Sequence, residues 1–422
     1  MTFKKTILQN GLRVITAPVK DGPTATTLVL VETGSKYENK RINGLSHFLE
    51  HMCFKGTVNR PTAMDITKEL DGLGAQSNAF TSQEYTGYWA KAHAGKLPEL
   101  LDIVSDIYLN PLFDANEIEK EKGVIVQEIN MYEDMPMRQV YDIFMEVLYG
   151  DQPAGWSITG PKEGVVKLTR EDFLVYRDKH YQASSTIVII AGGFDEEKVI
   201  EDVKQKFAGI REGKKEQKLP VKETQERPEI LLQHKDTDQT HLMVGVRSKN
   251  VFDKDTYVLD VLAGILGGGM SSRLFQKIRE EMGAAYYVRS GNDAYTDHGV
   301  LAVAIGSDNK KIFDVITATL EEFKKMTREL VPADELTKVK RYLVGHLFLD
   351  VESTDSLANF LGLQEVLTKK VFPPEEVAKK IEAVSADDIM RVAKEIFKNE
   401  RLNMALIGPY KEDTEFKKVF TL

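Results

Sequence analysis

The sequence predicts an α+β protein built from two tandem homologous domains, each a mostly antiparallel sheet packed by helices. Three observations support this prediction. The chain repeats itself at a spacing of about 216 residues, its strands and helices mix without strict alternation, and its 422 residues are too many for one ordinary hydrophobic core. A doubly wound parallel sheet would instead require regular alternation of strands and helices.

The clearest repeat pairs a segment that starts at Leu168 with one that starts at Val384. LTREDFLVYRDKHYQASSTIVIIAGG and VSADDIMRVAKEIFKNERLNMALIGP align without a gap. In each copy a Thr or Ser followed by acidic residues begins a helix, a polar turn follows, and an apolar strand ends at Gly192 or Gly408. The repeat therefore predicts a helix, a turn and a strand in both halves.

A second pair of segments supports the duplication. FDANEIEKEKGVIVQEI from Phe113 and VPADELTKVKRYLVGHL from Val331 both predict helices with acidic first turns. Within the first copy, residues 28–38 predict a strand with a polar end, residues 66–74 a short helix stopped by glycines, and residues 86–93 a strand of alternating polarity.

A charged stretch without apolar periodicity separates the two copies. REGKKEQKLPVKETQERP contains two prolines, which is typical of a linker. We therefore expect an N-terminal domain at residues 1–212, a linker at residues 213–228 and a C-terminal domain at residues 229–422. The basic run Lys214-Lys215 is interpreted as part of a solvated linker.

Composition and charge restrict the class of protein. The chain is 42% hydrophobic and 29% charged, and no segment approaches the roughly 20 apolar residues that cross a bilayer. The net charge of −9 argues against nucleic-acid binding, which needs a basic surface. The N-terminus lacks the apolar run of a secretory signal, and the single Cys53 cannot form an intramolecular disulfide. We expect a soluble cytoplasmic protein without a nucleic-acid or membrane partner.

Two histidines four residues apart are the strongest indication of chemistry. In GLSHFLEHMCFKGT, His47 and His51 fall on one face of a helix, where both imidazoles can bind one zinc ion. Glu50 lies on the same side, near enough to act as the general base toward a water activated by the metal. This order inverts the better-known H-E-x-x-H. A catalytic zinc usually takes three protein ligands, so a third must come from elsewhere.

The motif also has two alternative interpretations. The three residues could coincide by chance on an amphipathic helix, or they could form a structural zinc site. A closed structural site has no need of a base beside an open coordination position, so Glu50 argues against the latter. The remaining histidines have no second ligand at metal spacing, and we expect ordinary roles for them: His93, His180, His234, His241, His298 and His346.

The motif resembles that of the inverzincin peptidases, the group of pitrilysin, insulin-degrading enzyme and the mitochondrial processing peptidase. In that family the third zinc ligand is a glutamate after a long spacer of nearly constant length, on a helix of the form E-x-x-x-x-x-x-E. EKGVIVQE runs from Glu121 to Glu128 here, and the spacer between His51 and Glu128 has the length typical of the family. The resemblance implies that Glu128 is the third ligand of one Zn²⁺ per chain and that Glu121 orients a histidine.

The resemblance also implies residues that contact the substrate. GAQSNAFTSQEYTGYW is similar to the family's strand that holds a peptide backbone, with Asn78 and Ala79 at the contacting positions; a plain hairpin strand is the alternative. GGGMSSRLFQKIREEMGAAYYV is similar to the stretch that supplies an arginine and a tyrosine seven residues apart, which Arg279 and Tyr286 match. Such donors stabilise an oxyanion or hold the peptide.

The resemblance covers nearly the whole chain and implies a zinc-dependent endopeptidase that hydrolyses peptides or unfolded protein segments in a chamber between its halves. Because the second copy has no H-x-x-E-H, we expect the metal in the first half only. Short members of the family pair two chains, so we expect a homodimer or a complex with an inactive partner subunit. The alternative is a non-catalytic or partner-dependent subunit of a processing peptidase assembly; a non-catalytic subunit would have a degenerate motif.

Overall fold

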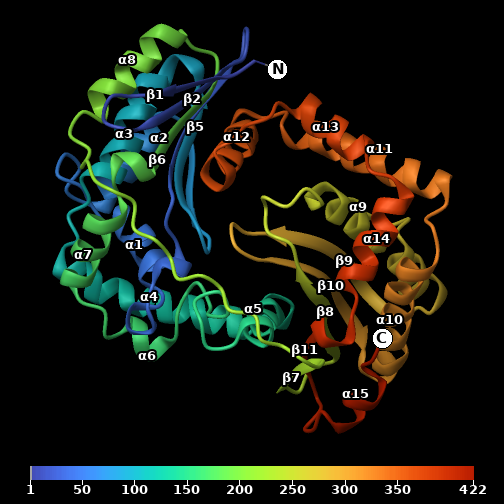
Figure 1. Ribbon diagram of the computed structural model, residues 1–422. Coiled ribbons are helices and arrows are strands. Elements are labelled where there is room, and N and C mark those ends of the chain that lie inside the picture. The colour runs from blue at the N-terminus through green and yellow to red at the C-terminus, as the bar shows by residue number, and fades with distance from the viewer. Residues whose placement is uncertain (1) are drawn as a thin grey trace. The chain divides into compact units, whose positions relative to one another are not determined.

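The computed structural model describes residues 2–422 and contains two sheets, each in a compact unit of its own (Figure 1). Each unit draws on three stretches of the chain. The first unit takes the chain up to Ile129, Ser157–Leu219 and Phe348–Glu375. The second unit takes Asn130–Trp156, Pro220–Leu347 and Glu376–Leu422. The predicted α+β class with two sheets is confirmed.

The first unit contains a six-stranded sheet in the order β1-β2-β6-β3-β5-β4. All neighbouring strands are antiparallel except β2 and β6, which are parallel. The strands are β1 (Lys4–Ile7), β2 (Arg13–Pro18), β3 (Thr24–Val31), β4 (Gln76–Thr81), β5 (Thr86–His93) and β6 (Thr186–Gly192). The central strands β3 and β6 are rich in β-branched and apolar residues and are buried almost throughout, whereas β4 forms one edge.

Helices cover both faces of this sheet. The main core lies between one face and the helices α1 (Leu45–Cys53), α3 (Leu97–Leu109) and α7 (Arg170–His180). On the opposite face, Leu357 and Leu361 of α12 (Thr354–Thr368) pack in one cluster with Leu28, Ile187 and Ile189. Because side chains alternate along a strand, β3 and β6 contribute to both cores.

The second unit contains a five-stranded sheet in the order β7-β11-β8-β10-β9, parallel only between β7 and β11. Its strands are β7 (Glu229–His234), β8 (Gln239–Ser248), β9 (Ala285–Ala294), β10 (Gly299–Asp308) and β11 (Leu402–Gly408). Its main core includes α9 (Thr256–Gly267), α10 (Ile312–Arg328) and α14 (Ala386–Ile396). The other face is covered by α5 (Pro136–Tyr149). Each sheet thus carries one helix from the other half of the sequence.

The predicted repeat of helix, turn and strand is confirmed. α14 in the second half corresponds to α7 in the first, and β11 corresponds to β6. Both pairs have the sequence offset that aligns Val384 with Leu168. Both helices begin with a capping box, formed by Thr169 and Asp172 in α7 and by Ser385 and Asp388 in α14. The second predicted pair also forms helices, α4 (Ala115–Glu133) and α11 (Ala333–Asp350).

The charged stretch at residues 211–228 forms no helix or strand within the described chain. The interpretation of Lys215 as a solvated linker residue is wrong, because its Nζ atom lies 2.5 Å from the buried carboxylate of Glu32.

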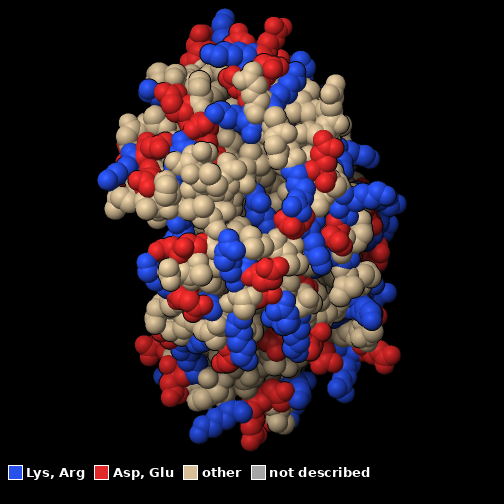
Figure 2. All heavy atoms as spheres, turned by 90° about the vertical axis from the view of Figure 1, so that its left-hand side faces the viewer, with Lys and Arg blue, Asp and Glu red and all other residues tan. Residues whose placement is uncertain are grey.

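The remaining helices are α2 (Ala63–Gly72), α6 (Lys162–Val165), α8 (Glu196–Lys206), α13 (Pro374–Glu382) and α15 (Thr414–Val419). Basic and acidic side chains intermingle over the face in Figure 2. Within residues 2–422, every helix is too short or too polar to span a bilayer.

Candidate metal centre

Helix α1 presents both histidines of the motif on one side while its other side enters the core. Phe48, Leu49 and Met52 are fully buried, which fixes the rotation of the helix against the sheet. His47 and His51 are one turn apart, and their ring centroids are separated by 4.6 Å. The local sequence therefore places two imidazoles side by side, as predicted.

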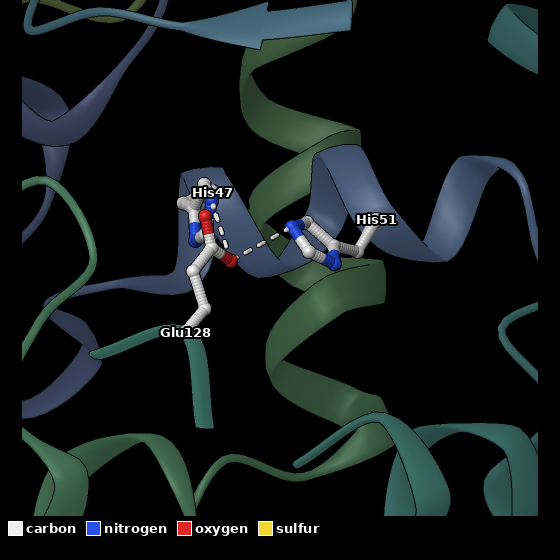
Figure 3. A group of neighbouring side chains, drawn as sticks. All are labelled: His47, His51 and Glu128. Atoms are coloured by element: carbon white, nitrogen blue, oxygen red, sulfur yellow. Dashed lines mark ion pairs between the residues drawn. The ribbon is translucent and has the colours of Figure 1, made fainter. Parts of the chain in front are cut away.

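Glu128 reaches the two histidines from α4. Its Oε2 atom lies 3.6 Å from His47 Nε2 and 3.4 Å from His51 Nε2 (Figure 3). One ligand atom from each of the three residues lies within 4.8 Å of the other two. The structure therefore brings together the three residues that the sequence and the resemblance assign to the metal.

These separations fit a shared metal ion better than direct hydrogen bonds. A good N–H···O bond spans about 2.7–3.2 Å. Zinc holds nitrogen and oxygen ligands at about 2.0–2.2 Å in a tetrahedron, which puts neighbouring ligand atoms about 3.4 Å apart. Two imidazole nitrogens and one carboxylate oxygen also make up a typical catalytic zinc set, with the fourth position left for water. The residues present thus fit Zn²⁺.

Glu121 links His51 to a nearby lysine. Its Oε1 atom lies 2.9 Å from His51 Nδ1, and its Oε2 atom lies 2.6 Å from Lys55 Nζ. Burial acts to raise the pKa of Glu121, but the hydrogen bonds with His51 and Lys55 outweigh it and leave the pKa below its ordinary value. By contrast, the buried Nδ1 atom of His47 has no hydrogen-bond partner among the described residues.

The carboxylates make the centre strongly attractive to positive charge. Burial acts to lower the pKa of His51, but the hydrogen bond with Glu121 and the negative charges of Glu128 and Glu50 outweigh it and raise that pKa to about 9. A site that favours a proton so strongly on an imidazole also favours a cation in its place. This electrostatic field agrees with the fit of the donor atoms to a metal ion.

Glu50 is held by a threonine from the edge strand. The Thr81 hydroxyl, at the end of β4, donates a 2.5 Å hydrogen bond to Glu50 Oε2. Burial raises the pKa of Glu50, while the bond from Thr81 and the neighbouring His47 and His51 act in the opposite direction. A partly buried carboxylate with a raised pKa is suited to accept a proton near neutral pH.

Asn78 and Ala79 lie on the same edge strand. β4 pairs on one side with β5, where they oppose Trp89 and Tyr88, and no strand pairs with its other side in the described chain. The Asn78 side chain is exposed and Ala79 is half-buried. A free strand edge offers main-chain donors and acceptors to an extended peptide.

Arg279 and Tyr286 belong to the second unit and contact each other. The guanidinium of Arg279 donates a 2.7 Å hydrogen bond to the Tyr286 carbonyl and lies 5.6 Å from the centre of the Tyr286 ring. Arg279 is on a π-helical segment (Phe275–Glu281), and the 73% exposed Tyr286 follows in β9. Such segments often mark functional positions.

The sequence interpretation missed two residues that contact the centre, Lys55 and Thr81. Lys55 is four residues after His51, a spacing that offered a signal, although α1 ends at Cys53. Thr81 is two residues after Ala79, so strand alternation places both on one face.

Models of two related domains match the chain. "Insulinase (Peptidase family M16)" matches residues 13–162, and "Peptidase M16 inactive domain" matches residues 167–343. An uncharacterized zinc protease of Rickettsia felis is 36% identical over 96% of this chain and 98% of its own length. One from Bacillus subtilis is 34% identical, with the same two coverages.

Solved structures share the fold. A protease from Helicobacter pylori superposes with a TM-score of 0.89 at 24% identity, over 97% of this chain and 99% of its own. A peptidase M16 inactive domain from Pseudomonas fluorescens gives the same TM-score and coverages at 17% identity. At these identities the likeness establishes the two-domain fold alone.

Proposed function

This chain belongs to peptidase family M16, and on that premise we propose that it is a zinc-dependent endopeptidase that hydrolyses peptides and unfolded protein segments. The observation that carries the proposal is the position of Glu128 Oε2, 3.6 Å and 3.4 Å from the Nε2 atoms of His47 and His51. The names of the relatives as zinc proteases support it.

A zinc ion held by His47, His51 and Glu128 would supply Lewis acidity, lowering the pKa of a water molecule and polarising the scissile carbonyl. Glu50 takes the proton of the attacking water on its carboxylate and passes it to the leaving amine. Thr81 keeps that carboxylate oriented through its 2.5 Å hydrogen bond. Glu121 fixes the ring of His51 so that Nε2 faces Glu128.

The free edge of β4 binds the peptide backbone in this proposal. Main-chain hydrogen bonds at Asn78 and Ala79 give affinity with little dependence on the substrate sequence. Because Thr81 ends the same strand, a peptide aligned on β4 lies beside the residue that holds Glu50. Arg279 and Tyr286 are the proposed further substrate contacts. The expected homodimer stays a prediction, which light scattering of the purified protein tests.

Hydrolysis of quenched fluorescent peptides by zinc-loaded protein tests the proposal. The wild type should cleave, a chelator should abolish cleavage, and Glu50→Gln should lose it while retaining zinc, because the amide cannot accept the proton. Glu119→Gln, which alters an exposed carboxylate on α4, is the matched control and should cleave normally. If the wild type binds zinc but cleaves no peptide, the chain either needs a partner subunit or is non-catalytic, and the proposal fails for the chain alone.

A further inference from the structure

Helix α1 begins without the side-chain cap that helices ordinarily use. The first turn of a helix has backbone N–H groups without intrahelical partners, and Ser, Thr, Asp or Asn at the N-cap usually accepts from one of them. The N-cap of α1 is Gly44, which has no side chain to do so. Both histidines of the metal centre lie within two turns of this start.

Gly44 is required here by its surroundings. Its φ angle is +97°, in the region that favours glycine, and an added Cβ atom would lie 2.5 Å from the carbonyl oxygen of Thr159. The backbone at residues 43 and 44 packs tightly against residues 159 and 160. The chain therefore excludes a capping side chain at this position.

Glu38 supplies the cap from outside the helix. Its Oε2 atom accepts from the backbone N–H of Gly44 at 2.8 Å and from Asn43 Nδ2 at 3.0 Å, and its Oε1 atom accepts from the backbone N–H of Ser46 at 2.6 Å. In an ordinary capping box, two side chains share the bonds to the N-cap and to the first turn. Here one carboxylate makes both kinds of bond, and it is only 3% exposed.

All three donors are N–H groups, so the cap requires a carboxylate with both oxygens free to accept. An amide at this position would turn an NH₂ group toward at least one N–H donor. The negative charge also complements the positive end of the helix. Burial raises the pKa of Glu38 to about 7, while the bonds from Ser46, Asn43 and Gly44 act in the opposite direction.

The residue after Ser46 is His47, so the capped turn leads directly into the metal centre. The Ser46 hydroxyl is itself 2.8 Å from the Tyr176 hydroxyl on α7. We propose that Glu38 is a positioning residue that fixes the first turn of α1 and thereby sets the geometry with which His47 and His51 bind zinc. This inference rests on the proposed function, because it presumes that these histidines bind zinc.

Zinc affinity, measured by competition with a chromogenic chelator at pH 8, tests the inference. Glu38→Gln should weaken zinc binding about tenfold, the lower range for residues that support metal ligands. The Co²⁺-substituted variant should also show altered d–d absorption bands, because the ligand geometry changes. Thr62→Ala is the matched control, since it removes the capping box of α2, a helix without metal ligands. It should lower the melting temperature and leave both metal readouts unchanged.

Glu38→Asp keeps the negative charge on a shorter side chain, and it tests the inference if Glu38→Gln does not fold. It should bind zinc more weakly than the wild type with shifted cobalt bands. Wild-type affinity within twofold and unshifted bands in the folded variant would overturn the inference. An equal loss of affinity in Thr62→Ala would overturn it too, because the effect would be general destabilisation. If the wild type binds no zinc, the proposed function itself fails.

Discussion

Glu121 holds the ring of His51 through a 2.9 Å contact between Oε1 and Nδ1, and Lys55 holds Glu121 through a 2.6 Å contact with Oε2. Glu121 and Glu128 are seven residues apart on α4, two turns along the same helix face. One helix therefore supplies both the proposed metal ligand and the carboxylate that orients another ligand.

Glu121→Gln should weaken zinc binding by about 10–100-fold, the usual effect of removing such an orienting carboxylate. The amide is neutral, so it orients His51 less strongly and loses the ion pair with Lys55. Chelator competition measures the change. Glu119→Gln on the same helix, whose exposed carboxylate pairs with Lys122, should bind zinc as the wild type does. Equal affinities of all three proteins would contradict the orienting role.

Thr81→Val should lower kcat for peptide hydrolysis about tenfold and leave zinc affinity unchanged. It removes the hydrogen bond to Glu50, and such bonds to charged groups contribute roughly 1.5–3 kcal/mol. KM should change little, because Thr81 contacts the base in this proposal. Thr81→Ser retains a hydroxyl and is expected to keep most of the activity. Steady-state kinetics measures kcat for both variants. Equal kcat values for Thr81→Val and Thr81→Ser would refute the role of the Thr81 hydroxyl in orienting Glu50.

Glu365→Gln should destabilise the protein by about 3 kcal/mol, because it leaves the buried guanidinium of Arg13 with one carboxylate partner, Glu32, in place of two. Glu365 on α12 is fully buried and accepts from Arg13 at 3.1 Å and Lys5 at 2.7 Å. Urea unfolding followed by circular dichroism measures the change. Glu99→Gln breaks an exposed pair with Lys96 and should shift the midpoint little. If Glu365→Gln unfolds at the same urea concentration as the wild type, the ion pair between Arg13 and Glu365 does not stabilise the packing of α12.

Asp255 should give stability a pH dependence at the acid end. Arg391 donates two hydrogen bonds to it at 2.7 Å and 2.9 Å and Lys249 one at 2.8 Å, which hold its pKa well below the ordinary value of 3.8. The unfolded chain therefore binds the proton first, so this stabilisation is present above about pH 4 and is lost as pH falls further. Asp255→Asn should be less stable at pH 7, with the difference shrinking in acid. If the urea midpoints of the wild type and Asp255→Asn change in parallel with pH, Asp255 does not cause the pH dependence of stability.

Sequence patterns predicted the helices and strands that are determined by neighbouring residues. The repeat from Leu168 and Val384 predicted two helices and two strands because capping residues and apolar runs are read from adjacent positions. The side-by-side placement of His47 and His51 follows from helix geometry alone. Glu128 came only from the family resemblance, because no local rule brings a residue so far along the chain to this helix.

The sequence did not reveal the contacts that form between segments far apart in the chain. The exchange of α5 and α12 between the two sheets depends on how the chain crosses from one half to the other. Glu38 reaches the first turn of α1 from a loop, and Thr81 reaches Glu50 from a strand edge; the packing of whole elements sets both contacts. Lys215 pairs with buried Glu32, although the pattern of its neighbours is typical of a solvated linker.

Anomalous diffraction at the zinc absorption edge from crystals of the zinc-loaded protein tests the central claim most directly. We expect one peak per chain, about 2.0–2.2 Å from His47 Nε2, His51 Nε2 and a carboxylate oxygen of Glu128. The Glu128→Gln variant, crystallised in parallel, should lose most of that peak. A strong zinc peak elsewhere, with these three side chains free of metal, would contradict the assignment.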